Sequence, residues 1–197
     1  FGKWQILLEK EVPKDQDLYC VTTAMSYYGK GIAHANLYDI SAARDMQCLF
    51  EKAVGRIPDT RYMHVVTCLD QMGVAREMLA GEIAYHEGDY DTAFDHLYEA
   101  VRKEDTLPYD EPWGWMMPSR HALGALLLDQ DRFEEAIDAY EADLGLNDDV
   151  VRANRHPNNV WALLGLHRCY IATDRANEAR LIKPQLDIAL ARADTGL

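Results

Sequence analysis

The sequence predicts an all-α protein, an α-solenoid of about four antiparallel helix pairs. One observation is a recurring pair of small residues, because Gly81 is followed by Ala93, and Gly124 by Ala136, twelve positions later. Another is that a short polar turn separates the two members of each pair. Antiparallel helices that cross closely need small residues where their backbones meet. Repetition of such a unit is typical of helical repeat arrays.

Two looser copies extend the array toward both ends of the chain. Gly31 and Ala43 are again twelve positions apart, whereas Gly165 and Ala179 are fourteen apart, as a turn longer by two residues would give. The four helix pairs are expected at residues 18–37 with 41–56, 71–87 with 90–104, 117–130 with 133–145, and 158–173 with 175–193. The sequence therefore predicts one repeat domain over residues 1–197, with repeats at about 18–56, 71–104, 117–145 and 158–193.

Residues 1–17 precede the first helix pair and are interpreted as a partial repeat or a capping helix. The chain begins at Phe1 rather than at Met, so we expect either a piece of a longer protein or an N-terminal segment that docks as a cap. A cap is needed because the end of a solenoid otherwise exposes apolar surface. Inserts are expected between the pairs at residues 58–71, 105–115 and 147–157.

The insert between the second and third pairs combines helix-breaking residues with large apolar ones. Pro108 and Pro112 prevent a regular helix, while Tyr109, Trp113 and Trp115 make the segment too apolar for a free linker. The segment must therefore pack on something. Either it fills the gap between the second and third pairs, or it forms a lid or side wall of a ligand groove, since ordered long loops are often binding elements.

The helix pairs resemble the tetratricopeptide repeat family, and this resemblance implies that they wind into a right-handed superhelix. The first helix of that family carries Trp-x-x-Leu-Gly, which Trp161, Leu164 and Gly165 match, and its second helix carries Ala, an aromatic residue and Ala. The second helices match in part through Ala93, Leu97, Ala100, Ala136 and Tyr140, with Asp143 where a small residue is usual. Residues 107–112 also resemble a segment from the C-terminal portion of longer, poorly characterised bacterial and fungal proteins of this family.

The resemblance implies a groove that binds a partner. In tetratricopeptide arrays the first helix of each pair lines a concave surface, and partners usually bind there. The groove-lining residues expected here are Tyr28, Met78, Glu82, Tyr85, His86, His121 and Tyr170, together with Tyr109, Trp113 and Trp115 of the insert. Chaperone-binding members of the family hold a peptide carboxylate with Lys and Asn. This chain has almost no Lys or Asn at the groove-lining positions, so an apolar or basic segment is the expected partner.

The composition excludes several classes of partner. The chain has 197 residues and a formal net charge of −13, and phosphate binding depends on clustered Lys and Arg, so nucleic acid and anionic membranes are disfavoured. No apolar run reaches the roughly 18 residues of a membrane span. The cysteines fall singly on apolar helical stretches, which predicts reduced core thiols and a cytoplasmic protein. They are Cys20, Cys48, Cys68 and Cys169.

One constellation permits chemistry. Glu82 and His86 are four positions apart on one helical face, and His121 is expected on the neighbouring first helix. This spacing permits a metal site of two histidines and one carboxylate. The alternative interpretation is that all three are exposed or hydrogen-bonded side chains without a ligand. The chain contains no nucleophile elbow and no nucleotide fingerprint, so no catalytic residue and no cofactor are expected.

Two classes of function follow from these patterns. The first is a protein–protein interaction or scaffolding module that binds a partner segment in the concave groove. The second is a metal-dependent enzyme or small-ligand binder that uses Glu82, His86 and His121 beneath the loop at residues 105–117. Self-association through the ends of the solenoid is a further expectation, because stacked repeats leave apolar end faces.

Overall fold

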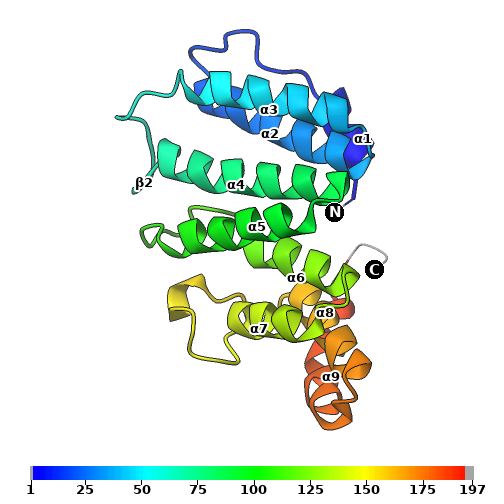
Figure 1. Ribbon diagram of the computed structural model, residues 1–197. Helices are drawn as coiled ribbons and strands as arrows, with labels where there is room; N and C mark the ends of the chain where they lie inside the picture. Colours follow the sequence, from blue (N-terminus) through cyan, green and yellow to red (C-terminus); the bar gives the residue numbers. More distant parts are fainter. Residues whose placement is uncertain (1, 194–197) are drawn as a thin grey trace. The chain divides into compact units, whose positions relative to one another are not determined.

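The computed structural model describes residues 2–193 and is almost entirely helical (Figure 1). The prediction of an all-α fold is therefore confirmed. The elements are α1 (Trp4–Glu9), α2 (Cys20–Asn36), α3 (Ile40–Val54), β1 (Tyr62–Met63), β2 (Val66–Thr67), α4 (Cys68–Glu87), α5 (Tyr90–Asp105), α6 (Ser119–Asp129), α7 (Phe133–Leu144), the 3₁₀ turn η1 (Arg152–Asn154), α8 (Val160–Ala172) and α9 (Ala176–Leu190). Among the described residues, no helix has both the length and the apolar character that a membrane crossing requires.

The chain divides into two compact units, Phe1–Met116 and Met117–Leu197, whereas one repeat domain is predicted from the sequence. The N-terminal unit contains the hairpins α2–α3 and α4–α5, with α4 packed on α2 and α1 lying against α2 (Figure 1). It also contains the small antiparallel β1–β2 hairpin, in which Tyr62 pairs with Thr67. The C-terminal unit contains the hairpins α6–α7 and α8–α9, and α8 packs on both α7 and α6.

The four helix hairpins turn in the same way. Each has a left-handed residue two positions before its second helix begins: Tyr38, Gly88, Asp131 and Asp174, with φ of 60°, 85°, 56° and 57°. The next backbone N–H then donates to a carbonyl five residues earlier, closing the last turn of the first helix. These bonds join Asp39 to His34, Asp89 to Ala84, Arg132 to Leu127 and Arg175 to Tyr170, at 2.9, 3.0, 2.9 and 2.8 Å. The two helices of each predicted pair are thus joined by the same type of turn.

Side-chain caps set several helix starts. The carboxylates of Asp39 and Asp89 accept from the backbone N–H of Ala42 and Thr92, which satisfies one of the orphan donors at the starts of α3 and α5. At α4, the Thr67 hydroxyl accepts from the N–H of Asp70, so this helix begins at Cys68, three residues before the predicted start at 71. The insert before α4 is correspondingly shorter than expected.

The recurring glycines make room at close helix crossings, as predicted, although their neighbours differ. A Cβ at Gly81 would lie 2.8 Å from Leu97 Cγ and 3.1 Å from the carbonyl oxygen of Ala93, so the predicted contact between Gly81 and Ala93 is confirmed. At Gly124 the nearest atoms belong instead to the Tyr140 ring, 2.6 Å from an added Cβ. Gly165 of α8 faces the same ring. Tyr140 therefore lies between two glycines from two different hairpins.

The core thiol prediction is confirmed for Cys20, Cys68 and Cys169, which are buried, and is wrong for Cys48, which is exposed on α3. All four are free thiols.

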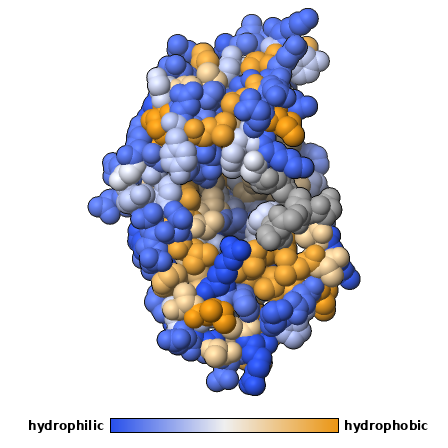
Figure 2. All heavy atoms as spheres, turned by 90° about the vertical axis from the view of Figure 1, so that its right-hand side faces the viewer, coloured by the Kyte–Doolittle hydropathy of each residue, from blue (hydrophilic) through white to orange (hydrophobic). Residues whose placement is uncertain are grey.

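In the C-terminal unit, several large apolar side chains remain on the surface of the last hairpin. They are Trp161, Ile171, Leu181 and Ile188, and hydrophobic patches are visible over these helices in Figure 2.

Candidate functional site

A polar cluster forms where the C-terminal ends of α2 and α4 meet in the N-terminal unit. Glu82 and His86 lie four positions apart on α4 and therefore share a face, as the sequence predicted. The amide of Asn36 on α2 donates to Glu82 Oε2 at 3.1 Å, and His86 Nε2 lies 3.7 Å from the same oxygen. The side chains of Glu82 and His86 are only 12% and 10% exposed.

Aromatic rings enclose the imidazole of His86. The ring of Tyr38 lies 5.2 Å away at an interplanar angle of 82°, and that of Tyr85 lies 5.5 Å away at 83°. Tyr85 itself packs edge-on against Tyr90 and Phe94. Within the described part of the chain, His86 Nε2 has no hydrogen-bond partner and is shielded from solvent. The cluster thus contains a polar nitrogen whose bonding capacity is unused.

Tyr28 lies deeper in the same unit and contacts the insert. Its ring packs edge-on against Trp115 at 5.7 Å, and both side chains are buried. Burial, followed by the negative charges of Glu82 and Glu104, raises the pKa of the Tyr28 hydroxyl well above its usual value. Tyr28 therefore stays neutral at physiological pH and contributes packing rather than charge.

The insert after α5 folds back onto the N-terminal unit. Gln71 of α4 donates to the carbonyl of Gly114 at 2.7 Å, and a Cβ at Gly114 would meet Val66 of β2 at 2.8 Å. His64 in the β1–β2 turn lies 3.5 Å from the Asp110 carboxylate. Trp115, at 6% exposure, anchors the segment. The insert therefore packs on α2, α4 and the β-hairpin.

Exposed apolar side chains gather on these two adjoining segments. Gln71 Nε2 contacts both Met63 Sδ, at 3.7 Å, and the backbone of Gly114, so the β-hairpin and the insert lie side by side. We call the exposed side chains of the two segments the aromatic–methionine surface: Tyr62, Met63, Val65, Tyr109, Trp113 and Met116. A large exposed apolar patch on a folded unit is a marker of an interaction site.

Several of the predicted groove residues are not accessible. Tyr28, Met78, Tyr85, Trp115 and Tyr170 are all less than a tenth exposed. They fill space between helices or beneath the insert, so a partner reaches them only if the structure rearranges. Tyr170 donates its hydroxyl to Glu141 at 2.6 Å, and burial together with this bond raises its pKa above the usual value. Tyr109 and Trp113 remain on the surface.

His121 lies in the C-terminal unit and bonds to a buried carboxylate. Its Nε2 contacts Asp143 Oδ2 at 2.9 Å, while His156 Nδ1 contacts Asp143 Oδ1 at 2.8 Å. The Asp143 side chain is 1% exposed. The backbone N–H of His156 also donates to the carbonyl of Asp143, at 2.7 Å, which fastens the segment after α7 to that helix. The resemblance to tetratricopeptide repeats led us to expect a small residue at position 143, and the Asp found there is the signal in the sequence that could have revealed this cluster.

The Asp143 cluster predicts a specific acid response. Burial alone would raise the pKa of Asp143, but the hydrogen bonds from His121 and His156 outweigh it and lower the pKa below the ordinary 3.8. A lowered pKa stabilises the folded state above the unfolded pKa, and this contribution is lost as the pH falls through the folded pKa. We expect the difference in urea midpoint between the wild type and Asp143→Asn to persist down to about pH 4 and to close below it. A difference that stays constant from pH 5 to pH 2 would contradict this assignment.

No metal centre forms around these residues. Across residues 2–193, no three His, Cys, Asp or Glu side chains are arranged to hold a metal ion. Glu82 and His86 belong to the N-terminal unit and His121 to the C-terminal unit, where the His121 ring already bonds to Asp143. The imidazoles of the Asp143 cluster direct nitrogens at the carboxylate rather than at a common vacant point.

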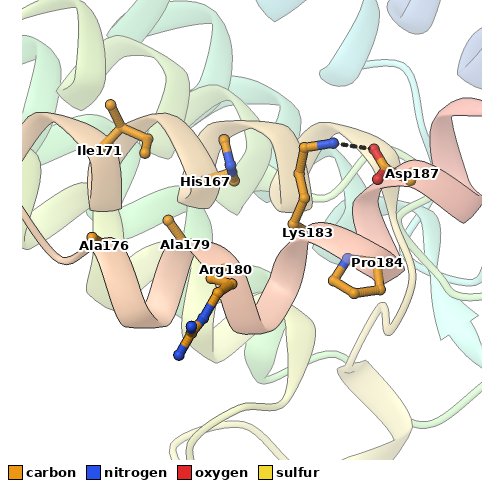
Figure 3. Close-up of a pocket in the computed structure, with 8 residues that line it drawn as sticks. All are labelled: His167, Ile171, Ala176, Ala179, Arg180, Lys183, Pro184 and Asp187. Carbon is orange, nitrogen blue, oxygen red and sulfur yellow. Dashed lines mark hydrogen bonds and ion pairs between the residues drawn. The ribbon is translucent and has the colours of Figure 1, made fainter.

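A shallow groove of about 520 Å³ lies between α8 and α9 (Figure 3). Its walls are formed by His167, Ile171, Ala176, Ala179, Arg180, Lys183, Pro184 and Asp187. Figure 3 shows Arg180 pointing away from α8, and Lys183 is already paired with Asp187. In the predicted repeat, Ala179 of α9 corresponds to Ala136 of α7. With this alignment, Arg180, Lys183 and Asp187 of α9 correspond to Ile137, Tyr140 and Leu144 of α7. Those three side chains of α7 are buried. This face of α9 is therefore polar, and it offers no enclosed binding site.

Comparison of the chain with known proteins found no match to a family model, to a curated protein or to a solved structure.

Proposed function

We propose that the chain is a non-catalytic protein–protein interaction module of tetratricopeptide type, whose partner binds the aromatic–methionine surface of the N-terminal unit. The observation that carries the proposal is this surface itself, six large apolar side chains exposed on two adjoining segments. The four identical hairpin turns support the repeat architecture. The free thiols support a reducing location such as the cytoplasm.

The surface is held in place before a partner arrives. The buried Trp115 and the Gln71 bond to Gly114 fix the insert on the helices, and the β1–β2 pairing fixes the other segment. Ordering a loop during binding lowers affinity, so a surface that is already ordered binds more tightly for the same area. Aromatic side chains and methionine are also enriched in the centres of protein interfaces.

The chemistry around this surface favours an apolar segment with basic flanks. The exposed carboxylate of Glu111 lies within the insert, next to Asp110, and the whole chain carries a net charge of −13. Such a field attracts a positively charged partner and speeds its encounter with the surface. The partner is thus a protein segment that combines large apolar residues with Lys or Arg.

Photo-crosslinking tests this proposal. A photoreactive amino acid replaces Tyr62 or Tyr109 in separate full-length variants, and replaces the exposed Leu181 of α9 as a matched control. We expect one protein to be crosslinked from both N-terminal positions and not from position 181. Trp113→Ala and Met63→Ala should each weaken its binding by about 2 kcal/mol or more, the range of interface hot spots.

Two outcomes would count against the proposal. Equal crosslinking from position 181 would show that the partner does not select this surface. Unchanged binding in both Trp113→Ala and Met63→Ala, with unchanged melting temperatures, would remove its basis. If the crosslinked protein is a second copy of the chain, light scattering at several concentrations will show self-association, and the partner is then the chain itself.

A further inference from the structure

We infer that Asn36, Glu82 and His86 form a binding site for an alkylammonium group, and that Tyr38 is its aromatic cover. This site lies at the C-terminal end of α4, whereas the aromatic–methionine surface lies at the opposite end of that helix. The inference therefore does not depend on the proposed partner.

The first observation is a buried carboxylate that lacks a full cation. Among the ion pairs formed within residues 2–193, Glu82 has only His86, at 3.7 Å, and its sole hydrogen bond comes from the Asn36 amide. A buried carboxylate is costly unless it is paired or fully hydrogen-bonded. Oε2 receives both contacts, which leaves acceptor capacity at the other oxygen for a ligand.

The second observation is the imidazole beside it. The His86 ring is nine-tenths buried, and its Nε2 is shielded from water with no hydrogen-bond partner among the described residues. This nitrogen faces the Glu82 carboxylate. A buried polar atom without a partner calls for an explanation, and an absent ligand is one.

The third observation is the presence of a tyrosine in a left-handed turn. The four equivalent turn positions are Tyr38, Gly88, Asp131 and Asp174. Gly and Asp tolerate this conformation, whereas a bulky side chain is strained in it. Tyr38 is also 76% exposed, so burial does not compensate the strain. What the residue does provide is a ring 5.2 Å from that of His86, at the edge of the cluster.

These three groups match the needs of an alkylammonium ion. Its N–H groups can donate to the second oxygen of the Glu82 carboxylate, next to the His86 ring, and its positive charge neutralises that carboxylate. Its alkyl part and charge can both rest against the face of Tyr38, through packing and a cation–π interaction. An anion is excluded by the carboxylate. A divalent metal is disfavoured because the Asn36 amide turns its N–H₂ donor toward Glu82 Oε2 and only one carboxylate is present.

The ligand has two sources, a free amine or a lysine side chain of another protein. The probes are n-butylammonium chloride, with n-butanol as the neutral control, and the peptide acetyl-Gly-Gly-Lys-Gly-Gly-amide, with Lys replaced by Gln as its control. The readout is the pair of ring-nitrogen resonances of His86 in the full chain labelled with ¹⁵N-histidine. We expect saturable shifts of the His86 resonances with the ammonium probe and none with butanol. Tighter binding of the lysine peptide than of butylammonium identifies a protein source, and equal binding identifies free amines.

Matched variants decide whether Glu82 is responsible. Glu82→Gln should weaken binding of the ammonium probe at least about tenfold, since it removes a buried charged acceptor. Glu87→Gln on the same helix removes the same charge from an exposed position next to His86, and should change affinity less than about twofold, because exposed charges are screened. Equal losses in the two variants overturn the inference, because the effect would then be one of net charge.

Tyr38→Gly keeps the assignment testable even if Glu82→Gln does not fold. Glycine suits the left-handed turn, so this variant should melt at the wild-type temperature or above it. It should nevertheless weaken butylammonium binding severalfold, through loss of the cation–π face. The inference is overturned if the wild type shows no saturable shift up to 100 mM probe, roughly the weakest binding such a site would give. It is also overturned if Tyr38→Gly binds as tightly as the wild type.

Discussion

Replacing Asp143 with Ala is expected to destabilise the C-terminal unit by about 3–5 kcal/mol, the usual cost of removing one partner from a buried charged network. Two imidazoles donate to this carboxylate, at 2.9 and 2.8 Å, and its side chain is 1% exposed. Alanine would leave both ring nitrogens without their acceptor in a space that water does not reach. An unsatisfied buried donor loses its full solvation, which exceeds the net gain of a normal hydrogen bond.

Two measurements test this effect: the free energy of unfolding in urea, and native-state hydrogen exchange. Asp138→Ala is the matched control, since Asp138 is an exposed carboxylate on the same helix. We expect less than about 0.5 kcal/mol from the control, as for most surface substitutions. Exchange should also accelerate at His156, whose backbone bond to Asp143 depends on the segment after α7 remaining docked. A loss below 1 kcal/mol, roughly one ordinary hydrogen bond, would mean that water or a shifted side chain replaces the carboxylate.

The local architecture was predictable because it depends on residues close together in the sequence. The alternation of apolar helix, Gly or Asp turn and second helix identified all four hairpins, and Gly88, Asp131 and Asp174 lie at their turns. The spacing of Glu82 and His86 placed them on one face, because four residues make about one helical turn. Tyr38 gave no such signal, since an aromatic residue is not expected at a left-handed position.

The environment of the site depends on packing between distant segments, which periodicity does not encode. Tyr28 and Trp115 are 87 positions apart, yet their rings are in contact. Both were predicted to line an accessible groove, because the spacing of residues along the chain does not show that the insert folds back onto α2. Asp143 and His156 lie on different elements, and only the position of the segment after α7 brings them together. The prediction that each recurring glycine faces the alanine of its own pair was also incomplete, because Gly124 and Gly165 accommodate the ring of Tyr140 instead.

The shared contact of the two glycines predicts a reversal of sign between two genetic backgrounds. Gly165→Ala in the wild type places a methyl group into the Tyr140 ring, so we expect about 1–3 kcal/mol of destabilisation from overpacking. The ring has little room to move toward α6, because it already lies against Gly124, where an added Cβ would be 2.6 Å from it. Elsewhere in a helix, replacing Gly with Ala stabilises by about 0.5–1 kcal/mol, because alanine loses less backbone freedom on folding.

Removing the ring should therefore convert the cost into a gain. Tyr140→Ala alone is expected to destabilise strongly, since a buried aromatic side chain is lost and a cavity of its size remains. In that background the methyl group of Gly165→Ala enters the cavity, and the free energy of unfolding should rise relative to Tyr140→Ala. The double-mutant cycle then gives a coupling energy of about 2 kcal/mol or more, as for residues in direct contact. Additive losses in the cycle would instead show that Gly165 is required by the backbone of α8 and not by its contact with Tyr140.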